Sequence, residues 1–326
     1  MQQYPKISIV TPSFNQGKYI EQTILSIIGQ GYPNLEYIII DGGSTDNTVE
    51  IIKKYESRLS YWISEPDSGQ SDALNKGLAK CTGDIFNWIN SDDYLQDNAL
   101  FAVAAHFMKH LGLDMVCGWC RLFDEQVPAE QLKHRTEIFT TLEETLVQQR
   151  INQPGSFYRL QAIRKLGDIN QQLHYVMDLD LWFRYLAANG QNRILLIDEL
   201  LAHFRMHGKS KTNLLQEKFR QEEKELWLHL LRQMKIDQTI TSFFAEGTQT
   251  TRFGNWNCKA VNKQRLTNHL CKKYLFRFYQ LRYVKAARFA FLNQLKTGNL
   301  RFKRVFIGIF FNLFVRRGAG LGRSID

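Results

Sequence analysis

The sequence has few of the residues that mark several classes of protein. Six prolines and five cysteines among 326 residues exclude a proline-rich linker protein and a disulfide framework. The sparse cysteines suit a reducing compartment. The longest apolar run near the C-terminus, residues 305–315, is interrupted by Gly308 and Asn312, and it is shorter than the about 20 residues that a membrane-spanning helix needs. The first residues carry no positive cluster before an apolar stretch, so we expect no secretory signal.

Hydrophobic and charged residues are present in the proportions of a folded protein. They make up 44% and 23% of the chain, which is enough apolar material for a sizeable core and excludes a disordered chain. The length fits one large domain or one domain with an appendage.

Acidic residues are nearly missing from the last quarter of the chain. From Arg252 onward there are 17 Lys or Arg and one acid, Asp326, whereas residues 1–251 hold 25 basic and 31 acidic residues. The chain is therefore a mildly acidic body with a strongly basic end. Such an end predicts a polyanionic partner, either an anionic membrane surface or a nucleic acid.

Short β-rich runs alternate with helical patterns in the first half of the chain. The predicted strands are 7–10, 35–40, 61–63 and 85–89, and helices are predicted between them and over 98–110. This alternation, with nearly continuous apolar runs in the strands, favours a parallel α/β sheet covered on both faces. In the less regular middle of the chain a further strand is expected over 193–197. After residue 214 the pattern turns helical, with basic, aromatic-rich helices over 274–295.

Polar residues follow three of these strands. Thr11, Asp41 and the cluster Asn90–Asp93 all stand at carboxyl ends, where α/β sheets place their ligand sites. Adjacent carboxylates at Asp92 and Asp93 would repel each other unless they share a cation, and Mg²⁺ or Mn²⁺ commonly bridges carboxylates to phosphates. Taken singly, each cluster is also explained by turn formation or helix capping.

Four motifs lie in order along the first hundred residues. They are Thr11-Pro12-Ser13-Phe14-Asn15, Asp41-Gly42-Gly43-Ser44-Thr45-Asp46, Asp67-Ser68-Gly69-Gln70-Ser71-Asp72 and Trp88-Ile89-Asn90-Ser91-Asp92-Asp93. Their order and spacing resemble the family 2 glycosyltransferases. The resemblance implies a GT-A-like (Rossmann-like) α/β fold with a mixed, mostly parallel sheet flanked by helices. It also implies a nucleotide-sugar donor and a transfer that inverts the anomeric configuration.

The resemblance assigns donor-binding roles to residues of this sequence. Thr11, Pro12 and Ser13 match the loop that borders the donor nucleotide, and Asp41 matches the aspartate that contacts its base. Asp72, in the third motif, is expected to bind the donor as well.

The fourth motif matches the acidic metal motif of the family. The resemblance implies that Asp92 lies against the donor and that Asp93 is a ligand of the Mn²⁺ or Mg²⁺ on its diphosphate. Asn90 stands where the family often has a further aspartate, so its contact with the metal is left open.

Two downstream segments continue the resemblance. Residues 175–184 are similar to a second acidic motif, in which a Glu-Asp pair precedes an apolar helix and the aspartate is the catalytic base. Met177 replaces the glutamate here, and Asp178 aligns with the base; Asp180 is the second candidate. His207 matches a histidine that can approach the metal or the diphosphate, and it is predicted as a metal ligand. A carboxylate base fits the chemistry, because attack at an anomeric carbon needs a hydroxyl that loses its proton.

Two cysteines and the basic end can each be interpreted in more than one way. Cys117 and Cys120 have the spacing of a zinc or redox pair, but their apolar, strand-like surroundings favour buried thiols. The basic end is interpreted first as a contact with a membrane interface, second as packing helices with solvated basic faces, and third as a nucleic-acid site. No recognised nucleic-acid module is present, so no nucleic-acid partner is expected.

These observations lead to one functional prediction. Residues 1–213 are expected to form a GT-A-like catalytic domain, and residues 214–326 a helical, basic region in contact with an anionic membrane surface. The predicted reaction is inverting transfer from a nucleotide-diphosphate donor, a UDP-hexose on family grounds, to a hydroxyl of a lipid-linked glycan. It would serve bacterial surface polysaccharide synthesis, such as that of O-antigen, at the inner face of the cell membrane. A sugar-phosphate nucleotidyltransferase and a non-catalytic glycan-binding or scaffold protein remain the alternatives.

Overall fold

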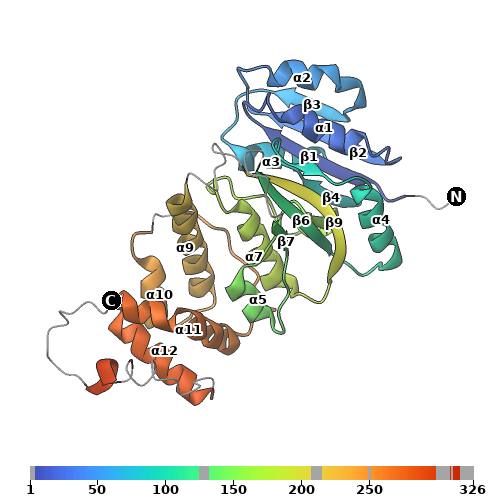
Figure 1. Ribbon diagram of the computed structural model, residues 1–326. Coiled ribbons are helices and arrows are strands. Elements are labelled where there is room, and N and C mark those ends of the chain that lie inside the picture. Colours follow the sequence, from blue (N-terminus) through green and yellow to red (C-terminus); the bar gives the residue numbers. More distant parts are fainter. Residues whose placement is uncertain are drawn as a thin grey trace.

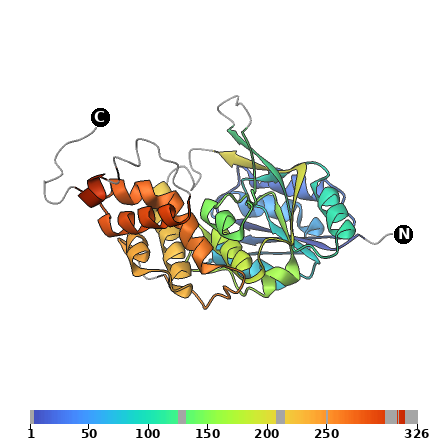
Figure 2. The ribbon, with the colours of Figure 1, turned by 90° about the horizontal axis from the view of Figure 1, so that it is seen from below.

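The chain folds into an α/β part built on one sheet and a helical part packed beside it, as the computed structural model shows in two views (Figure 1, Figure 2). The structure describes residues 4–124, 132–206, 215–248, 251–298, 309 and 311–315.

Nine strands form one sheet among the described residues. They are β1 (Ile7–Ser13), β2 (Leu35–Asp41), β3 (Tyr61–Ser64), β4 (Ile85–Trp88), β5 (Tyr94–Leu95), β6 (Met115–Asp124), β7 (Leu132–Arg135), β8 (Ser156–Arg159) and β9 (Ile194–Met206). Their order is β3-β2-β1-β4-β8-β6-β9-β5, with β7 paired to β6. The longest pairings are parallel, β1 with β2 and β6 with β9, whereas β8 pairs antiparallel with both β4 and β6. The predicted mixed, mostly parallel sheet is confirmed.

Helices cover both faces of this sheet and build the second part. They are α1 (Ile20–Ile28), α2 (Thr48–Lys54), α3 (Gln70–Lys80), α4 (Ala99–Lys109), α5 (Leu142–Gln148), α6 (Leu160–Arg164), α7 (Met177–Asn189), α9 (Gln216–Gln233), α10 (Gln238–Ala245), α11 (Lys263–Gln280) and α12 (Val284–Lys296), with short helical turns η1 (Glu56–Arg58) and η2 (Phe311–Val315). Helices α9 to α12 lie together at the lower left of Figure 1, beside α5 and α7. The expected helical C-terminal region is present.

Two apolar clusters hold these layers together. All seven residues of β1 are buried, as expected for a strand covered on both faces. On one face Ile24 of α1 and Leu100 of α4 belong to a cluster with the sheet. On the other face a single cluster runs from α3 and α7 on the sheet through α9 to α11 and α12. The C-terminal helices therefore share a continuous apolar core with the face of the sheet that α7 covers.

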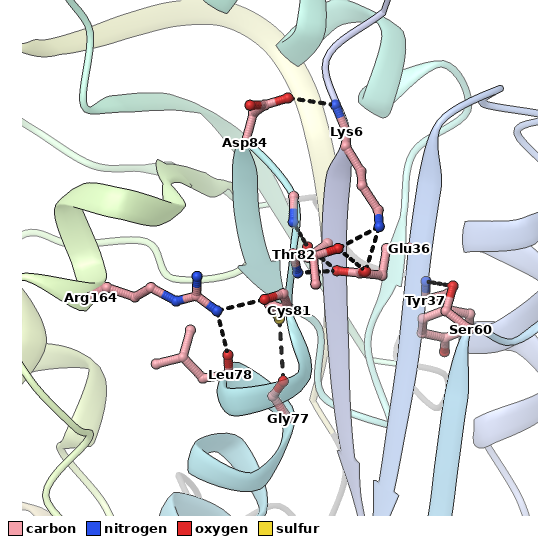
Figure 3. Close-up of polar contacts among 12 residues, drawn as sticks. Lys6, Glu36, Tyr37, Ser60, Gly77, Leu78, Cys81, Thr82, Asp84 and Arg164 are labelled. Atoms are coloured by element: carbon pink, nitrogen blue, oxygen red, sulfur yellow. Dashed lines mark hydrogen bonds and ion pairs between the residues drawn. The ribbon is translucent and has the colours of Figure 1, made fainter.

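A network of hydrogen bonds and an ion pair lies at the amino-terminal ends of β1, β2 and β4 (Figure 3). Glu36 is 6% exposed, and its carboxylate pairs with Lys6 Nζ at 2.7 Å. It also accepts hydrogen bonds from the Ser8 hydroxyl at 2.5 Å and from the backbone N–H and hydroxyl of Thr82, each at 2.6 Å. Burial raises the pKa of this carboxyl, but the donors outweigh it and hold the pKa at about 2. The network joins β1, β2 and the loop before β4.

Several elements differ from those predicted from the sequence. The strand expected over 193–197 continues to Met206, because β9 pairs with β6 along its whole length across an irregular register near Gly118. A Cβ at Gly118 would lie 2.6 Å from the Glu199 carbonyl oxygen, so glycine permits this irregularity. The helical stretch over 274–295 is divided at Arg282, whose φ of 61° is left-handed. The short elements β5, β7 and α5 were not predicted.

Candidate active site

A cavity of about 910 Å³ opens at the carboxyl ends of β1, β2 and β4. Its walls come from the loops after these strands, from β6, β7 and the end of β9, and from the start of α7 and one residue of α9. The polar and aromatic residues on these walls include Ser13, Asp67, Asn90, Asp92, Tyr175, Asp178 and Phe219. Segments far apart in the sequence therefore meet around one space.

The loop after β1 gives the cavity part of its wall. Pro12 and Ser13 line it, and the Ser13 hydroxyl is buried without a hydrogen-bond partner among the described residues. Thr11 is fully buried and lies away from the cavity, with its hydroxyl 3.1 Å from that of Tyr37. Of the three residues predicted here, the structure brings two to the cavity.

Asp41 was predicted to contact the base, but its carboxylate forms hydrogen bonds with the turn after β2 and with Ser64. It is fully buried and does not line the cavity. Its carboxylate accepts hydrogen bonds from the backbone N–H groups of Gly43 and Ser44 and from the hydroxyls of Ser44 and Ser64, at 2.5 to 3.2 Å. This arrangement shapes the turn after β2, as a carboxylate does at an Asp-Gly turn.

Asp67 is a cavity-lining carboxylate that the sequence prediction named only as part of the third motif, which could either line the site or begin a helix. It follows β3, and its Oδ1 accepts a hydrogen bond from the Gly69 N–H at 2.8 Å. A Cβ at Gly42 would lie 2.8 Å from Asp67 Oδ2, so the glycine leaves room for this side chain. Burial raises the pKa of Asp67 above its ordinary value. The sequence signal was its place after the third strand, where a helix start explained the same residues.

Asp72 lies in the first turn of α3, outside the cavity wall. Its carboxylate accepts hydrogen bonds from the Ser68 N–H at 3.1 Å and from Gln171 Nε2 at 3.0 Å, and Lys76 lies 3.7 Å away. These contacts are those of a helix-start residue, so the predicted contact with the donor has no support in its position.

The two adjacent carboxylates after β4 have different surroundings. Asp92 lines the cavity together with Asn90. Asp93 is 1% exposed, and its oxygens accept hydrogen bonds from the Arg205 N–H at 2.9 Å and from Asn90 Nδ2 at 3.3 Å. Burial, and then the charge of Asp92, raise the pKa of Asp93 well above its ordinary value. Asp92 therefore faces the cavity, whereas the side chain of Asp93, the predicted metal ligand, is buried and does not line it.

No three His, Cys, Asp or Glu side chains of the described residues come together as a ligand cluster. His207, the other predicted metal ligand, lies outside the residues that the structure describes. On the cavity wall after β4, Asp92 is placed where it could hold a divalent cation together with the oxygen atoms of a bound diphosphate, and Mg²⁺ accepts such oxygen ligands readily.

Asp178 lies in the first turn of α7 and lines the cavity. Burial raises its pKa to about 6, while the Leu179 N–H donates to its Oδ1 at 2.8 Å. Asp180, the second candidate for the base, is 1% exposed and pairs with Arg184 at 2.7 Å. Only Asp178 of the two faces the cavity, and its pKa suits a general base that works near neutral pH.

The turn before α7 is held by a residue that the sequence gave no reason to choose. Glu222 of α9 accepts hydrogen bonds from three successive backbone N–H groups, of His174, Tyr175 and Val176. Phe219, also on α9, lines the cavity and packs on Tyr175 with ring centroids 5.2 Å apart. The C-terminal helices therefore reach the site.

The two cysteines of the Cys117–Cys120 motif are buried thiols, as expected. Cys117 and Cys120 lie on β6, are free, and are at most 1% exposed. Burial raises the pKa of Cys117 to about 12, so this thiol is far from the thiolate that zinc binding or redox chemistry needs.

Comparison with known proteins agrees with this geometry. Residues 8–167 match the family model described as Glycosyl transferase family 2. An uncharacterized glycosyltransferase of Rickettsia typhi is 26% identical over 244 residues, which cover 72% of this chain and 74% of that protein. The poly(ribitol-phosphate) beta-N-acetylglucosaminyltransferase TarS of Staphylococcus aureus is 27% identical over 202 residues, 60% of this chain and 34% of TarS.

Solved structures show the same fold. TarS residues 1–349 in complex with UDP-GlcNAc align with a TM-score of 0.56 at 16% identity, covering 88% of this chain and 81% of that one. The glucosyl-3-phosphoglycerate synthase of Mycobacterium tuberculosis, in complex with Mn²⁺, UDP and phosphoglyceric acid, aligns with a TM-score of 0.50 at 21% identity, covering 70% and 78%. The fold is GT-A-like, and residues 8–167, just under half of the chain, match glycosyl transferase family 2.

Proposed function

We propose that the protein is an inverting glycosyltransferase that moves a sugar from a UDP-sugar to a hydroxyl of a glycan. One observation carries this proposal: a single cavity has Ser13, Asp67 and Asp92 on its walls together with Asp178, whose pKa is raised to about 6. The first three suit a nucleotide diphosphate, and the last suits the removal of a proton.

The donor nucleotide is proposed to lie beside Ser13 and Asp67 and to form hydrogen bonds with both side chains. Asp67 accepts a hydrogen bond from the base, the role first predicted for Asp41. The unpartnered hydroxyl of Ser13 donates to the ligand, because a buried donor without a partner is costly. Thr11, Asp41 and Asp72 act on the shape of the loops instead.

A divalent cation, Mn²⁺ or Mg²⁺, is proposed to be held by Asp92 and the donor diphosphate. When bound, such an ion neutralises the charge that develops on the departing diphosphate. Support comes from the position of Asp92 and from the structurally similar synthase, which was crystallised in complex with Mn²⁺ and UDP. Asp93 is proposed to hold the Asp92 loop against Arg205 rather than to bind the ion.

Asp178 is proposed to act as the general base. Its carboxylate is ionised above about pH 6 and faces the cavity, so it can take the proton of an acceptor hydroxyl as that oxygen attacks the anomeric carbon. Attack from the face opposite the leaving group inverts the configuration without an enzyme nucleophile. The acceptor is proposed to be a lipid-linked glycan of a bacterial surface polymer, in keeping with TarS, whose name describes transfer to poly(ribitol-phosphate).

The helical region over 214–326 is proposed to contact an anionic membrane surface, while residues 1–213 form the catalytic domain. No helix in the described part of the chain has the length and apolar character needed to cross a bilayer. From Arg252 to Gly298 there is no acidic residue, and Phe276, Val284 and Leu292 on α11 and α12 are 41–50% exposed. Apolar side chains among basic ones fit an interface of anionic lipids.

Assays with UDP-sugars, and with UTP and a sugar phosphate, distinguish the glycosyltransferase from its alternatives. With Mn²⁺ present, UDP-GlcNAc or UDP-glucose should raise the melting temperature and release UDP slowly when water replaces the acceptor. Pyrophosphate formation from UTP and a sugar phosphate would instead identify a nucleotidyltransferase. Binding of neither donor, with no UDP release, would contradict the proposal and leave a scaffold protein.

Vesicle sedimentation tests the membrane contact. The full chain should sediment with phosphatidylglycerol vesicles, stay in solution with phosphatidylcholine vesicles, and lose the binding in about 0.5 M salt because screening weakens charge contacts. A chain ending at Gly298 should bind more weakly. Equal sedimentation with both lipids would reject the contact, and preferential binding to RNA would favour the nucleic-acid interpretation.

A further inference from the structure

The start of α7 has no cap of its own. The first N–H groups of a helix have no partner within it, and they are usually satisfied by a side chain at the N-cap. The N-cap residue Val176 has no oxygen on its side chain and makes no such bond. The contacts that hold this end of α7 in place therefore have to come from outside the helix.

Glu222 of α9 holds the turn that leads into the helix. Its Oε1 accepts from the His174 N–H at 2.9 Å, and its Oε2 accepts from the N–H groups of Tyr175 at 2.8 Å and Val176 at 3.1 Å. The side chain is buried, with 8% of the residue exposed. A carboxylate in this place also interacts favourably with the positive end of the helix dipole.

The held turn leads directly into the cavity. Asp178 follows Val176 by two residues, and the Asp180 N–H returns to the Val176 carbonyl at 3.0 Å as the helix begins. Tyr175 and Asp178 both line the cavity, as does Phe219, which precedes Glu222 by three residues on α9. Glu222 and Phe219 lie outside the residues that match the family model.

We propose that Glu222 is a positioning residue: by holding the turn 174–176 it fixes the start of α7 and directs the Asp178 carboxylate at the acceptor hydroxyl. The inference rests on the proposed function, because Asp178 acts there as the base. It adds that the C-terminal helices are required for the chemical step as well as for packing.

Glu222→Gln tests the proposal with little change in shape. The substitution replaces one acceptor oxygen by an NH₂ donor that faces backbone N–H groups, so the turn loosens. We expect kcat for UDP release from UDP-GlcNAc with Mn²⁺ to fall about tenfold or more, since small misplacements of a catalytic group are costly. The KM for UDP-GlcNAc should stay within about twofold, because the donor side is untouched.

Glu225→Gln is the matched control. Glu225 lies three residues further along α9, is 4% exposed, and accepts hydrogen bonds from Gln221 and Thr251. Within the described part of the chain, the N–H groups of residues 174–176 bond to Glu222 and not to Glu225. Its variant should keep the wild-type kcat. Amide hydrogen exchange should quicken at residues 174–176 in Glu222→Gln and stay unchanged there in Glu225→Gln.

The outcomes separate the inference from the function beneath it. Unchanged exchange at 174–176, or faster exchange with wild-type kcat, would overturn the positioning role. A wild-type chain that releases UDP from neither UDP-GlcNAc nor UDP-glucose would overturn the proposed function itself. If Glu222→Gln fails to fold by circular dichroism, Glu222→Asp replaces it; the shorter acid keeps the charge and should give a smaller fall in kcat with faster exchange.

Discussion

The two ends of the parallel strands hold carboxylates whose pKa values are shifted in opposite directions. At the amino-terminal ends, Lys6, Ser8 and Thr82 surround Glu36 and lower its pKa to about 2. At the carboxyl ends, burial raises the pKa of Asp67 and raises that of Asp178 to about 6. Burial acts on all three, so the number of donors decides the sign. A carboxylate saturated by donors stabilises the fold, whereas one left short of donors beside a cavity is available for chemistry.

The largest expected effect is that of Asp178→Asn. Because general bases contribute about 10²- to 10⁴-fold, kcat for UDP release should fall by roughly that factor while the KM for the donor is kept. The buried charge is also lost, so the free energy of unfolding at pH 7 should rise by about 1 kcal/mol. Steady-state kinetics and urea unfolding measure the two effects. Normal turnover would reject Asp178 as the base.

Glu36→Gln should show the reverse pattern, with unchanged kcat and lower stability. The folded-state pKa of Glu36 is depressed, so its ionised form stabilises the fold above its ordinary value near 4.5, and that contribution is lost as the pH falls toward 2. We expect a loss of about 2–3 kcal/mol at pH 7 that shrinks between about pH 5 and pH 2. A constant difference between variant and wild type over that range would contradict the assignment.

The neighbours Asp92 and Asp93 should separate binding from stability within one loop. Asp92→Asn is expected to weaken Mn²⁺-dependent binding of UDP-GlcNAc by about tenfold with little change in melting temperature. Asp93→Ala removes a buried acceptor from the Arg205 N–H, so it should cost about 1–3 kcal/mol of stability. Calorimetry measures the binding, and thermal melts measure the stability. If Asp93→Ala weakened Mn²⁺-dependent binding and Asp92→Asn did not, the metal ligand would be Asp93.

The smallest effects concern two serines of β1. Ser13→Ala removes a hydroxyl without a partner among the described residues, so donor affinity should fall a few-fold while stability is kept. Ser8→Ala removes a hydroxyl that bonds to Glu36 and to the Gly83 N–H, so it should cost about 1 kcal/mol of stability and leave donor binding alone. Equal behaviour of the two variants would mean that the two ends of the strand do not differ in role.

Much of the sheet could be predicted from local pattern. The helix predicted between the first two strands is found as α1, and β1, β2 and β3 begin at the predicted residues. Apolar runs and helical periods fix such elements, because burial against both faces of the sheet selects the residues. Edge and insertion elements such as β7 depend on partners distant in the sequence, so periodicity did not reveal them.

The site was predictable in place and less so in detail. Polar residues after β1, β2 and β4 were expected at one edge, and Ser13, Asp92 and Asp178 do line one cavity. Whether a carboxylate faces the cavity depends on the turn that follows it: Asp41 bonds to Ser44 and Ser64, whereas Asp67 does not. Glu222 acts from another helix, and no local signal in the sequence marks it.

The most direct test of the account is the pH dependence of UDP release from UDP-GlcNAc with Mn²⁺. The wild-type rate should rise with pH through about 6 and then level off, because Asp178 must be ionised to accept a proton. The small residual rate of Asp178→Asn should lack this rise. A rise near pH 6 that survives in Asp178→Asn, or a flat wild-type profile, would contradict the claim that this carboxylate is the base.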